Sequence, residues 1–125
     1  MGYKLIGLAL AGACGALARY GLAGVFQRAQ QIGFLWGTLT VNALGCFLFG
    51  LIWTLTQQRL AISPDTRTIV LVGFLGSFTT FSTFLFETDQ MLEHAEWIMA
   101  GLNLTGQLGL GLAAYLLGSF LGRMA

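Results

Sequence analysis

The sequence predicts an all-α integral membrane protein with four spanning helices, and three observations support this prediction. Hydrophobic residues make up 56% of the 125 residues and charged residues only 9%. Mean hydropathy is +0.77, so the expected solvent is a bilayer rather than water. The few charged residues leave four apolar stretches, each close to the roughly 20 residues that span a bilayer. The loops between them are short, so residues 1–125 are expected to form a single four-span membrane domain.

The first span is expected at about residues 5–26. It is too long for a signal-peptide core, no Ala-x-Ala-type cleavage site follows it, and it leads directly into further spans, so we expect it to be retained. The second span is expected at about residues 34–57. It begins near Gly33-x3-Gly37, a spacing of small residues that lets helix backbones approach closely.

The third span is expected at about residues 68–86, after the loop that holds the only proline. Ser63 or Asp65 is expected to cap the start of this helix. The fourth span is expected at about residues 97–122 and ends in a second small-residue spacing, Gly118-x3-Gly122. Three tryptophans lie near the expected span ends, as in aromatic belts: Trp36, Trp53 and Trp97.

The distribution of basic residues predicts the orientation of the chain in the membrane. Four spans return both termini to one side, and four of the six basic residues lie on that side. These four are Lys4, Arg59, Arg67 and Arg123, against Arg19 and Arg28 toward the other side. The positive-inside rule then places the termini in the cytoplasm. The margin is small, so insertion in both orientations stays open.

Several function classes are excluded by composition and motifs. A net charge of +1 gives no basic field for nucleic acid. Cys14 and Cys46 lie inside the first two spans, where a thiol behaves as a small apolar residue. The sequence has no Walker motif, no Ser/His/Asp set and no Cys/His cluster, and the single histidine, His94, falls in a charged loop. We therefore expect no enzymatic activity.

Polar side chains inside the expected spans mark the candidate functional site. Such groups are costly in a bilayer unless they are paired or hydrated. Their depth can be estimated by counting residues inward from the membrane face that carries the first and third loops, at 1.5 Å per residue. By this count, nine polar residues lie in the same half of the membrane. The set is Arg19, Thr38, Asn42, Thr79, Thr80, Ser82, Thr83, Asn103 and Gln107.

The chemistry of this set favours an anion. It offers hydroxyl and amide donors and one arginine, whereas Glu87 is expected at the end of its span and contributes no carboxylate at that depth. Phe81 and Phe84 are three residues apart and share a helix face. Their ring edges can face an anion, although packing against lipid or protein is the common role of such rings.

The polar set lines only half of the membrane thickness. A continuous path needs either a second half from Tyr115 and Ser119 or a partner chain inserted in the opposite orientation. We favour the partner chain, because no internal repeat supplies pseudo-symmetry within one chain.

Three strings in the sequence resemble the CrcB/Fluc family of fluoride channels. They are Gly15-Ala16-Leu17-Ala18-Arg19-Tyr20, Gly37-Thr38-Leu39-Thr40-Val41-Asn42-Ala43-Leu44-Gly45 and Gly73-Phe74-Leu75-Gly76-Ser77-Phe78-Thr79-Thr80-Phe81-Ser82-Thr83-Phe84. The string Asn103-Leu104-Thr105-Gly106-Gln107 is a looser match. The resemblance covers nearly the whole chain.

The resemblance implies an antiparallel, dual-topology homodimer with two fluoride pores and a break in the third helix of each chain. It also implies a structural sodium ion at the dimer interface, held by main-chain carbonyls that correspond to Gly76 and Thr79 of each chain. Irregular backbone at membrane depth is tolerated where it is buried in protein or lines a wet cavity.

The resemblance also implies roles for individual residues. Arg19 would stand in the vestibule of the pore. The implied pore residues are Asn42, Phe81, Phe84, Ser82, Thr83, Thr80, Asn103 and Gln107. Of the donors, Asn42, Ser82 and Thr83 are expected to meet the ion. Gln107 and Ser77 depart from the family pattern, which more often has a small hydroxyl residue and a glycine at these positions.

The expected function is passive, fluoride-selective export across the cytoplasmic membrane. Fluoride enters cells as neutral HF and ionises inside, so a negative membrane potential drives the anion out and lowers its toxicity. The expected partners are fluoride, sodium, a second copy of the chain and the lipid bilayer. One alternative is a four-span proton-coupled multidrug exporter, which requires a carboxylate inside a span. Another is a noncatalytic membrane assembly subunit.

Overall fold

The computed structural model describes residues 1–29 and 35–125, and all regular structure in them is helical. The elements are α1 (Gly2–Ala29), α2 (Leu35–Gln58), α3 (Pro64–Thr68), the π-helical segment η1 (Ile69–Leu75), α4 (Gly76–Phe78), α5 (Phe81–Glu93) and α6 (Trp97–Met124). Four stretches are long and apolar enough to cross a membrane, as predicted. Gly33 and the expected start of the second span at residue 34 lie outside the described residues.

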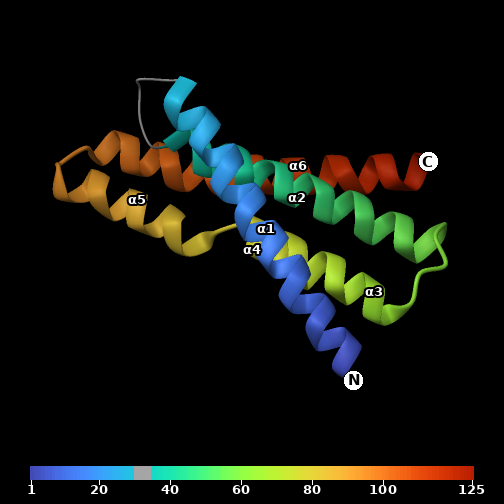
Figure 1. Cartoon of the computed structure of the whole chain (residues 1–125). Helices are drawn as coiled ribbons and strands as arrows, with labels where there is room; N and C mark the ends of the chain where they lie inside the picture. The colour runs from blue at the N-terminus through green and yellow to red at the C-terminus, as the bar shows by residue number, and fades with distance from the viewer. Residues whose placement is uncertain (30–34) are drawn as a thin grey trace.

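The four spans form a bundle in which α2 and α6 run side by side in the same direction, while α1 crosses them near the middle of the molecule (Figure 1). The elements α3, η1 and α4 follow one another as a single rod, and α5 continues the span beyond a break. A small core joins α2 to this rod, made by Val41, Leu71, Leu75 and Phe78. The third span is therefore anchored just before its break.

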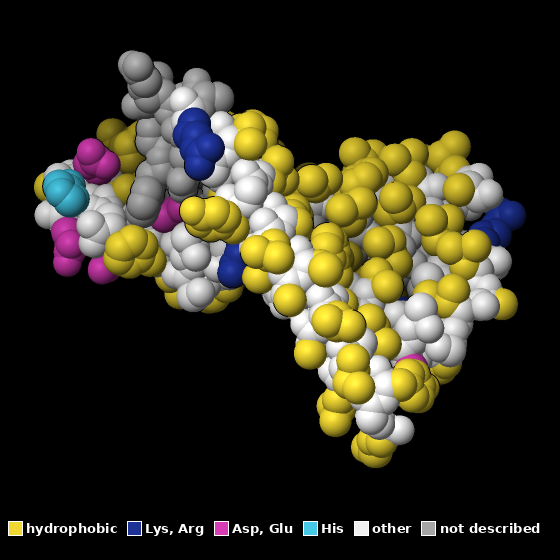
Figure 2. Space-filling model, in the orientation of Figure 1, with side chains coloured by type: hydrophobic (Ala, Val, Ile, Leu, Met, Phe, Trp, Pro, Cys, Tyr) yellow, Lys and Arg dark blue, Asp and Glu magenta, His cyan; other side chains and the backbone are white. Residues whose placement is uncertain are grey.

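Apolar side chains cover most of the visible surface, whereas acidic side chains and the histidine gather at one end (Figure 2). That end holds the exposed residues Asp89, Glu93, His94 and Glu96 around the connection of α5 to α6. Large exposed apolar side chains run along α1, including Leu5, Leu10 and Leu17. This distribution suits a bilayer, in which apolar surface is solvated by lipid.

The close contact of α2 with α6 depends on glycines. A Cβ added at Gly118 would lie 2.1 Å from the carbonyl oxygen of Phe47, and one at Gly50 would lie 2.2 Å from the carbonyl oxygen of Tyr115. The predicted role of the Gly118-x3-Gly122 spacing in close backbone approach is therefore confirmed, because at Gly122 a Cβ would also meet Thr54, at 2.9 Å.

Substitution of Gly118 by alanine is expected to destabilise the protein by about 1–3 kcal/mol, the usual range for overpacking. The obstructing atom is a backbone oxygen, so α2 and α6 must separate. Thermal unfolding in detergent measures the effect. Gly109→Ala on the same helix, where a Cβ meets nothing within 4 Å, is the matched control and is expected to unfold at or slightly above the wild-type temperature, because alanine favours a helix more than glycine does. Equal unfolding temperatures for the two variants would contradict the packing described here.

The cap expected at the start of the third span is present, and the helix begins at Pro64 rather than at about residue 68. Ser63 is the N-cap of α3, where its side chain accepts a hydrogen bond from the Thr66 amide at 3.1 Å, and Pro64 takes the first helical position. Asp65 forms an ion pair with Lys4 at 2.9 Å. This contact joins the start of α3 to the start of α1.

The expected break in the third helix is present. After α4 the backbone of Thr79 is extended, with φ −84° and ψ 158°. Thr80 is also extended and acts as the N-cap of α5, because its hydroxyl accepts a hydrogen bond from the Thr83 amide at 3.2 Å. Threonine is a favoured N-cap residue. The sequence Thr79-Thr80 thus ends one helix and starts the next within two residues.

The helix of the third span does not end near Glu87, where the end of the span was expected. Helix α5 continues to Glu93, and Glu87 is only 1% exposed. Its carboxylate accepts a hydrogen bond from the hydroxyl of Thr38 on α2. Counting hydropathy placed the end of the span too early, because packing against α2 and α6 covers this turn. The third span therefore does contain a buried carboxyl group.

Candidate functional site

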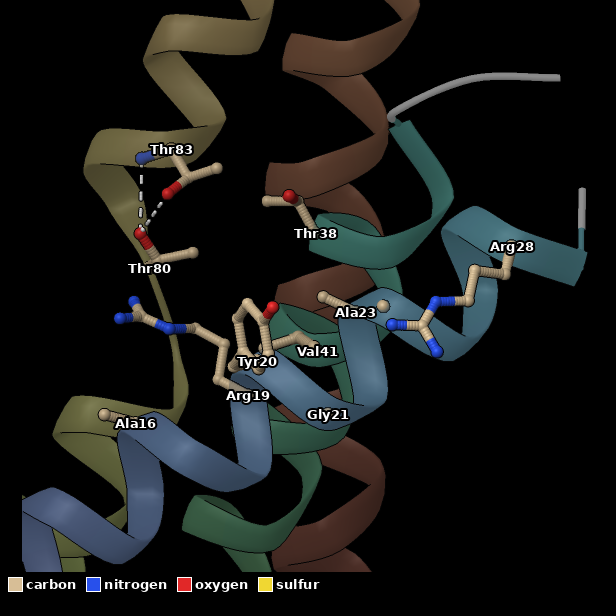
Figure 3. A pocket seen from close by; sticks show the side chains of 11 residues that line it. Ala16, Arg19, Tyr20, Gly21, Ala23, Arg28, Thr38, Val41, Thr80 and Thr83 are labelled. Carbon is tan, nitrogen blue, oxygen red and sulfur yellow. Dashed lines mark hydrogen bonds between the residues drawn. The ribbon is translucent and has the colours of Figure 1, made fainter. Parts of the chain in front are cut away.

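Two pockets flank the helix break, and Thr80 lines both. One pocket, here called the vestibule, has a volume of about 420 Å³ and is lined mainly by α1, with Thr38, Thr80 and Thr83 on its other side (Figure 3). The other, here called the aromatic pocket, has a volume of about 290 Å³ and is lined by Phe81 and Phe84 together with residues of α2 and α6.

The vestibule is electropositive. Arg19 and Arg28 both line it, and none of its described lining residues is acidic. Arg19 extends from α1 toward the break, where Nη1 donates to the main-chain carbonyl of Thr79 at 3.4 Å (Figure 3). A concave surface with this charge concentrates anions. The family resemblance implied a vestibule role for Arg19 but none for Arg28, which was counted only in predicting the orientation of the chain.

Hydroxyl groups stand on the α5 side of the vestibule. The Thr80 hydroxyl donates to Thr83 Oγ1 at 3.0 Å (Figure 3), so the Thr83 hydroxyl keeps its own hydrogen for another acceptor. Ser82 is exposed, and its Oγ lies 3.4 Å from Thr80 Oγ1. The predicted donors Ser82 and Thr83 are thus accessible from outside the chain.

Asn42 holds the break in place. Its Oδ1 accepts a hydrogen bond from the Thr80 amide at 2.8 Å, and its Nδ2 donates to the Thr80 carbonyl at 2.9 Å. The same Nδ2 donates to Oε1 of Gln107 on α6 at 3.1 Å. Asn42 therefore supplies the partner that the Thr80 amide loses at the break and adds a second donor to the Thr80 carbonyl. Both of its amide N–H groups are engaged by protein.

The aromatic pocket is walled by two rings in an edge-to-face arrangement. The centroids of Phe81 and Phe84 lie 5.5 Å apart, at an interplanar angle of 69°. Phe84 is 3% exposed, whereas Phe81 is 66% exposed. Gln107 also lines this pocket and is 7% exposed.

Asn103 does not join the group around the break. Its Nδ2 donates to the hydroxyl of Thr88 at 2.9 Å, and Thr88 lies two turns along α5 from Thr80, about 12 Å away. Thr88 and Glu87 are both buried there. The structure therefore separates the predicted polar set into the Asn42 group at the break and a second group farther along α5. No local sequence pattern indicated Thr88 as a member of either group.

The main-chain carbonyls that the family resemblance assigns to sodium have the chemistry of a cation site. In a continuous helix the Gly76 carbonyl would accept from the Thr80 amide, but that amide donates to Asn42. The Thr79 carbonyl would accept from the Thr83 amide, which instead donates to Thr80 Oγ1. Main-chain carbonyl oxygens are suitable ligands for a hard cation. The guanidinium of Arg19 lies against one of them.

Comparisons with known proteins give a consistent result. A family model described as "CrcB-like protein, Camphor Resistance (CrcB)" matches residues 6–119. The chain is 53% identical over 118 residues to a protein of Nitrosococcus oceani named fluoride-specific ion channel FluC, with 94% of each chain covered. Proteins of the same name from Nitratidesulfovibrio vulgaris (strain Miyazaki F) and Desulforapulum autotrophicum are 50% and 49% identical, with 97% or more of every chain covered.

Proposed function

We propose that this chain, which belongs to the CrcB-like protein family, is a fluoride channel that exports the ion passively and so lowers its toxicity to the cell. It is a multi-pass protein of the bacterial cell membrane, with four spanning helices, and acts in transport rather than as an enzyme. Its relatives carry the name fluoride-specific ion channel over nearly the full length of this chain.

One structural observation supports this function above all: polar side chains line the space on both sides of the helix break. Arg19 and Thr83 line the vestibule, and Gln107, Phe81 and Phe84 line the aromatic pocket. Fluoride is small and strongly hydrated, so a pore must replace its water with close donors. Fluoride efflux from liposomes that contain only the purified protein tests the proposal.

The two alternatives are less well supported. A proton-coupled exporter requires a carboxyl group inside a span, and Glu87 supplies one, so its absence can no longer be used against that function. Relatives that match almost end to end are nevertheless named channels, not exporters. A noncatalytic assembly subunit would give no ion flux from purified protein.

A second copy of the chain in the opposite orientation is part of the proposal. The exposed apolar face of α1 and the exposed Gly76 at the break offer a surface for it. A Cβ added at Gly76 has one neighbour within 4 Å, the Leu71 carbonyl oxygen at 3.8 Å, so a partner can approach closely there. The carbonyls of Gly76 and Thr79 from both chains would then form the sodium site.

The antiparallel arrangement predicts that the termini are found on both sides of the membrane. Reporter fusions at the C-terminus, one active only in the cytoplasm and one active only outside it, are expected to give signals of comparable size. Crosslinks between copies should also join the start of α1 in one chain to the face of the other chain that carries the first and third loops. Fusions that report a single orientation would contradict the dual topology. They would not bear on fluoride conduction, which the efflux assay tests separately.

A further inference from the structure

Helix α1 packs closely against the rod that ends at the break. A Cβ added at Gly15 would lie 2.2 Å from the carbonyl oxygen of Phe74, and one added at Gly12 would lie 3.2 Å from Ser77 Oγ. Arg19 follows Gly15 by four residues and therefore lies on the same face of α1. This close approach of the two helices places Arg19 beside the break (Figure 3).

The end of the rod carries partial negative charge. The rod runs without interruption from Pro64 to Phe78, and its aligned peptide dipoles give the last turn about half a negative charge. A cation near such a helix end is stabilising, and more so at membrane depth, where little water screens it. Arg19 supplies this cation, because its Nη1 donates to the Thr79 carbonyl at 3.4 Å. Its charge is permanent, since arginine does not deprotonate in proteins.

The Thr79 carbonyl is also one of the oxygens that the family resemblance assigns to sodium. Two cations that draw on one oxygen are close neighbours, and like charges repel strongly where the dielectric constant is low. None of the described residues that line the vestibule is acidic, so no carboxylate there offsets the charge of Arg19. Arg19 therefore opposes a second cation at this carbonyl as long as the contact lasts.

We propose that Arg19 is the cation of the break when sodium is not bound, and that it lowers the affinity of the break for sodium. This inference rests on the sodium site of the proposed function and adds a side chain to a site otherwise made of main-chain carbonyls. Sodium binding releases the Arg19 guanidinium from the Thr79 carbonyl into the vestibule. The cation site and the electropositive vestibule are thereby linked through one side chain.

Thermal unfolding at increasing sodium concentration tests this antagonism without a measurement of conduction. The protein is purified without sodium, and sodium chloride then replaces N-methyl-D-glucamine chloride at constant ionic strength. A ligand that binds only the folded state raises the unfolding temperature once its concentration exceeds the dissociation constant. Arg19→Gln is expected to show a given rise at a sodium concentration at least about tenfold lower than the wild type needs.

The sodium dependence separates this role from a merely structural one. Without sodium, Arg19→Gln is expected to unfold below the wild-type temperature, because the end of the rod loses its cation. This difference is expected to shrink as sodium is added. Arg19→Lys keeps a cation and is expected to respond to sodium as the wild type does. An Arg19→Gln protein that is less stable by the same amount at every sodium concentration would overturn the inference.

The matched control is Arg28→Gln. Arg28 lines the same vestibule, and its replacement changes the charge by the same amount, but its side chain makes no hydrogen bond to the break in the described part of the chain. This variant is expected to respond to sodium as the wild type does, and a shift equal to that of Arg19→Gln would overturn the inference. A wild type that does not respond to sodium would reject the sodium site itself, while fluoride efflux is tested separately.

The wild-type protein gives a second measurement, which does not require any variant to fold. Phenylglyoxal modifies accessible arginine side chains, and mass spectrometry quantifies the modification at each residue. Sodium is expected to raise the modification rate of Arg19 by at least about threefold, in proportion to the released population, and to leave that of Arg28 unchanged. An unchanged or slower modification of Arg19 in sodium would show that the guanidinium is not released and would overturn the inference.

Discussion

Alanine at position 42 is expected to remove measurable fluoride efflux and to destabilise the protein by about 2–4 kcal/mol. Asn42→Ala leaves the buried amide of Thr80 without its partner, which costs about 1–3 kcal/mol, and removes the bond to the Thr80 carbonyl, which is worth about 1 kcal/mol. The break then loses its fixed shape, and the Gln107 amide loses its orientation. Both pockets share Thr80, so both are expected to change.

Thermal unfolding in detergent and fluoride efflux from liposomes measure these two effects. Thr40 lies on the same helix and forms no side-chain hydrogen bond with the residues that the structure describes, so Thr40→Ala is the control and is expected to behave as wild type in both assays. An Asn42→Ala protein with wild-type unfolding temperature and wild-type efflux would show that Asn42 does not hold the break.

Isoleucine at position 81 is expected to reduce fluoride efflux by about 100-fold or more without loss of stability. Phe81 is 66% exposed, so its replacement removes little packing, but it removes a ring edge and leaves an aliphatic group that a small anion avoids. The 100-fold figure corresponds to about 2.7 kcal/mol in the conduction barrier. Phe84→Ile should reduce efflux as much, with an added loss of stability because Phe84 is 3% exposed.

The contrast between the two variants makes the assignment testable. Equal unfolding temperatures for wild type and Phe81→Ile, together with lost efflux, would assign the effect to conduction rather than folding. Phe120 on α6 is 57% exposed and lines neither pocket, so Phe120→Ile is the control and should conduct normally. Normal efflux from both Phe81→Ile and Phe84→Ile would contradict the assignment of the aromatic pocket to the pore.

Local rules account for the features that were predicted from sequence. Span length and charge spacing gave four membrane helices, and capping preferences gave Ser63 as the start of the third span. The break was expected only from the family resemblance. Its local signal is the capping threonine Thr80, three residues before the Thr83 amide that it accepts from.

Tertiary contacts account for what the sequence did not reveal. Asn42 contacts Thr80, which is 38 positions away in the chain, and Gln107, which is 65 positions away. No local sequence pattern can therefore predict this network. Counting hydropathy likewise ended the third span before Glu87, because burial of that side chain depends on Thr38 from another helix. The position of a residue along its helix predicts its approximate depth in the membrane but not which side chain it contacts. Asn103 is an example, because its hydrogen-bond partner is Thr88 on another helix.

The most direct test of fluoride conduction is efflux from liposomes that contain only the purified protein, with fluoride and chloride compared in parallel. A potassium gradient with valinomycin sets the voltage, and pH is equal on both sides, so no proton gradient contributes. The predicted result is rapid, voltage-driven fluoride efflux with little chloride efflux. No fluoride efflux, equal efflux of the two anions, or fluoride efflux that requires a proton gradient would contradict a passive fluoride-selective channel.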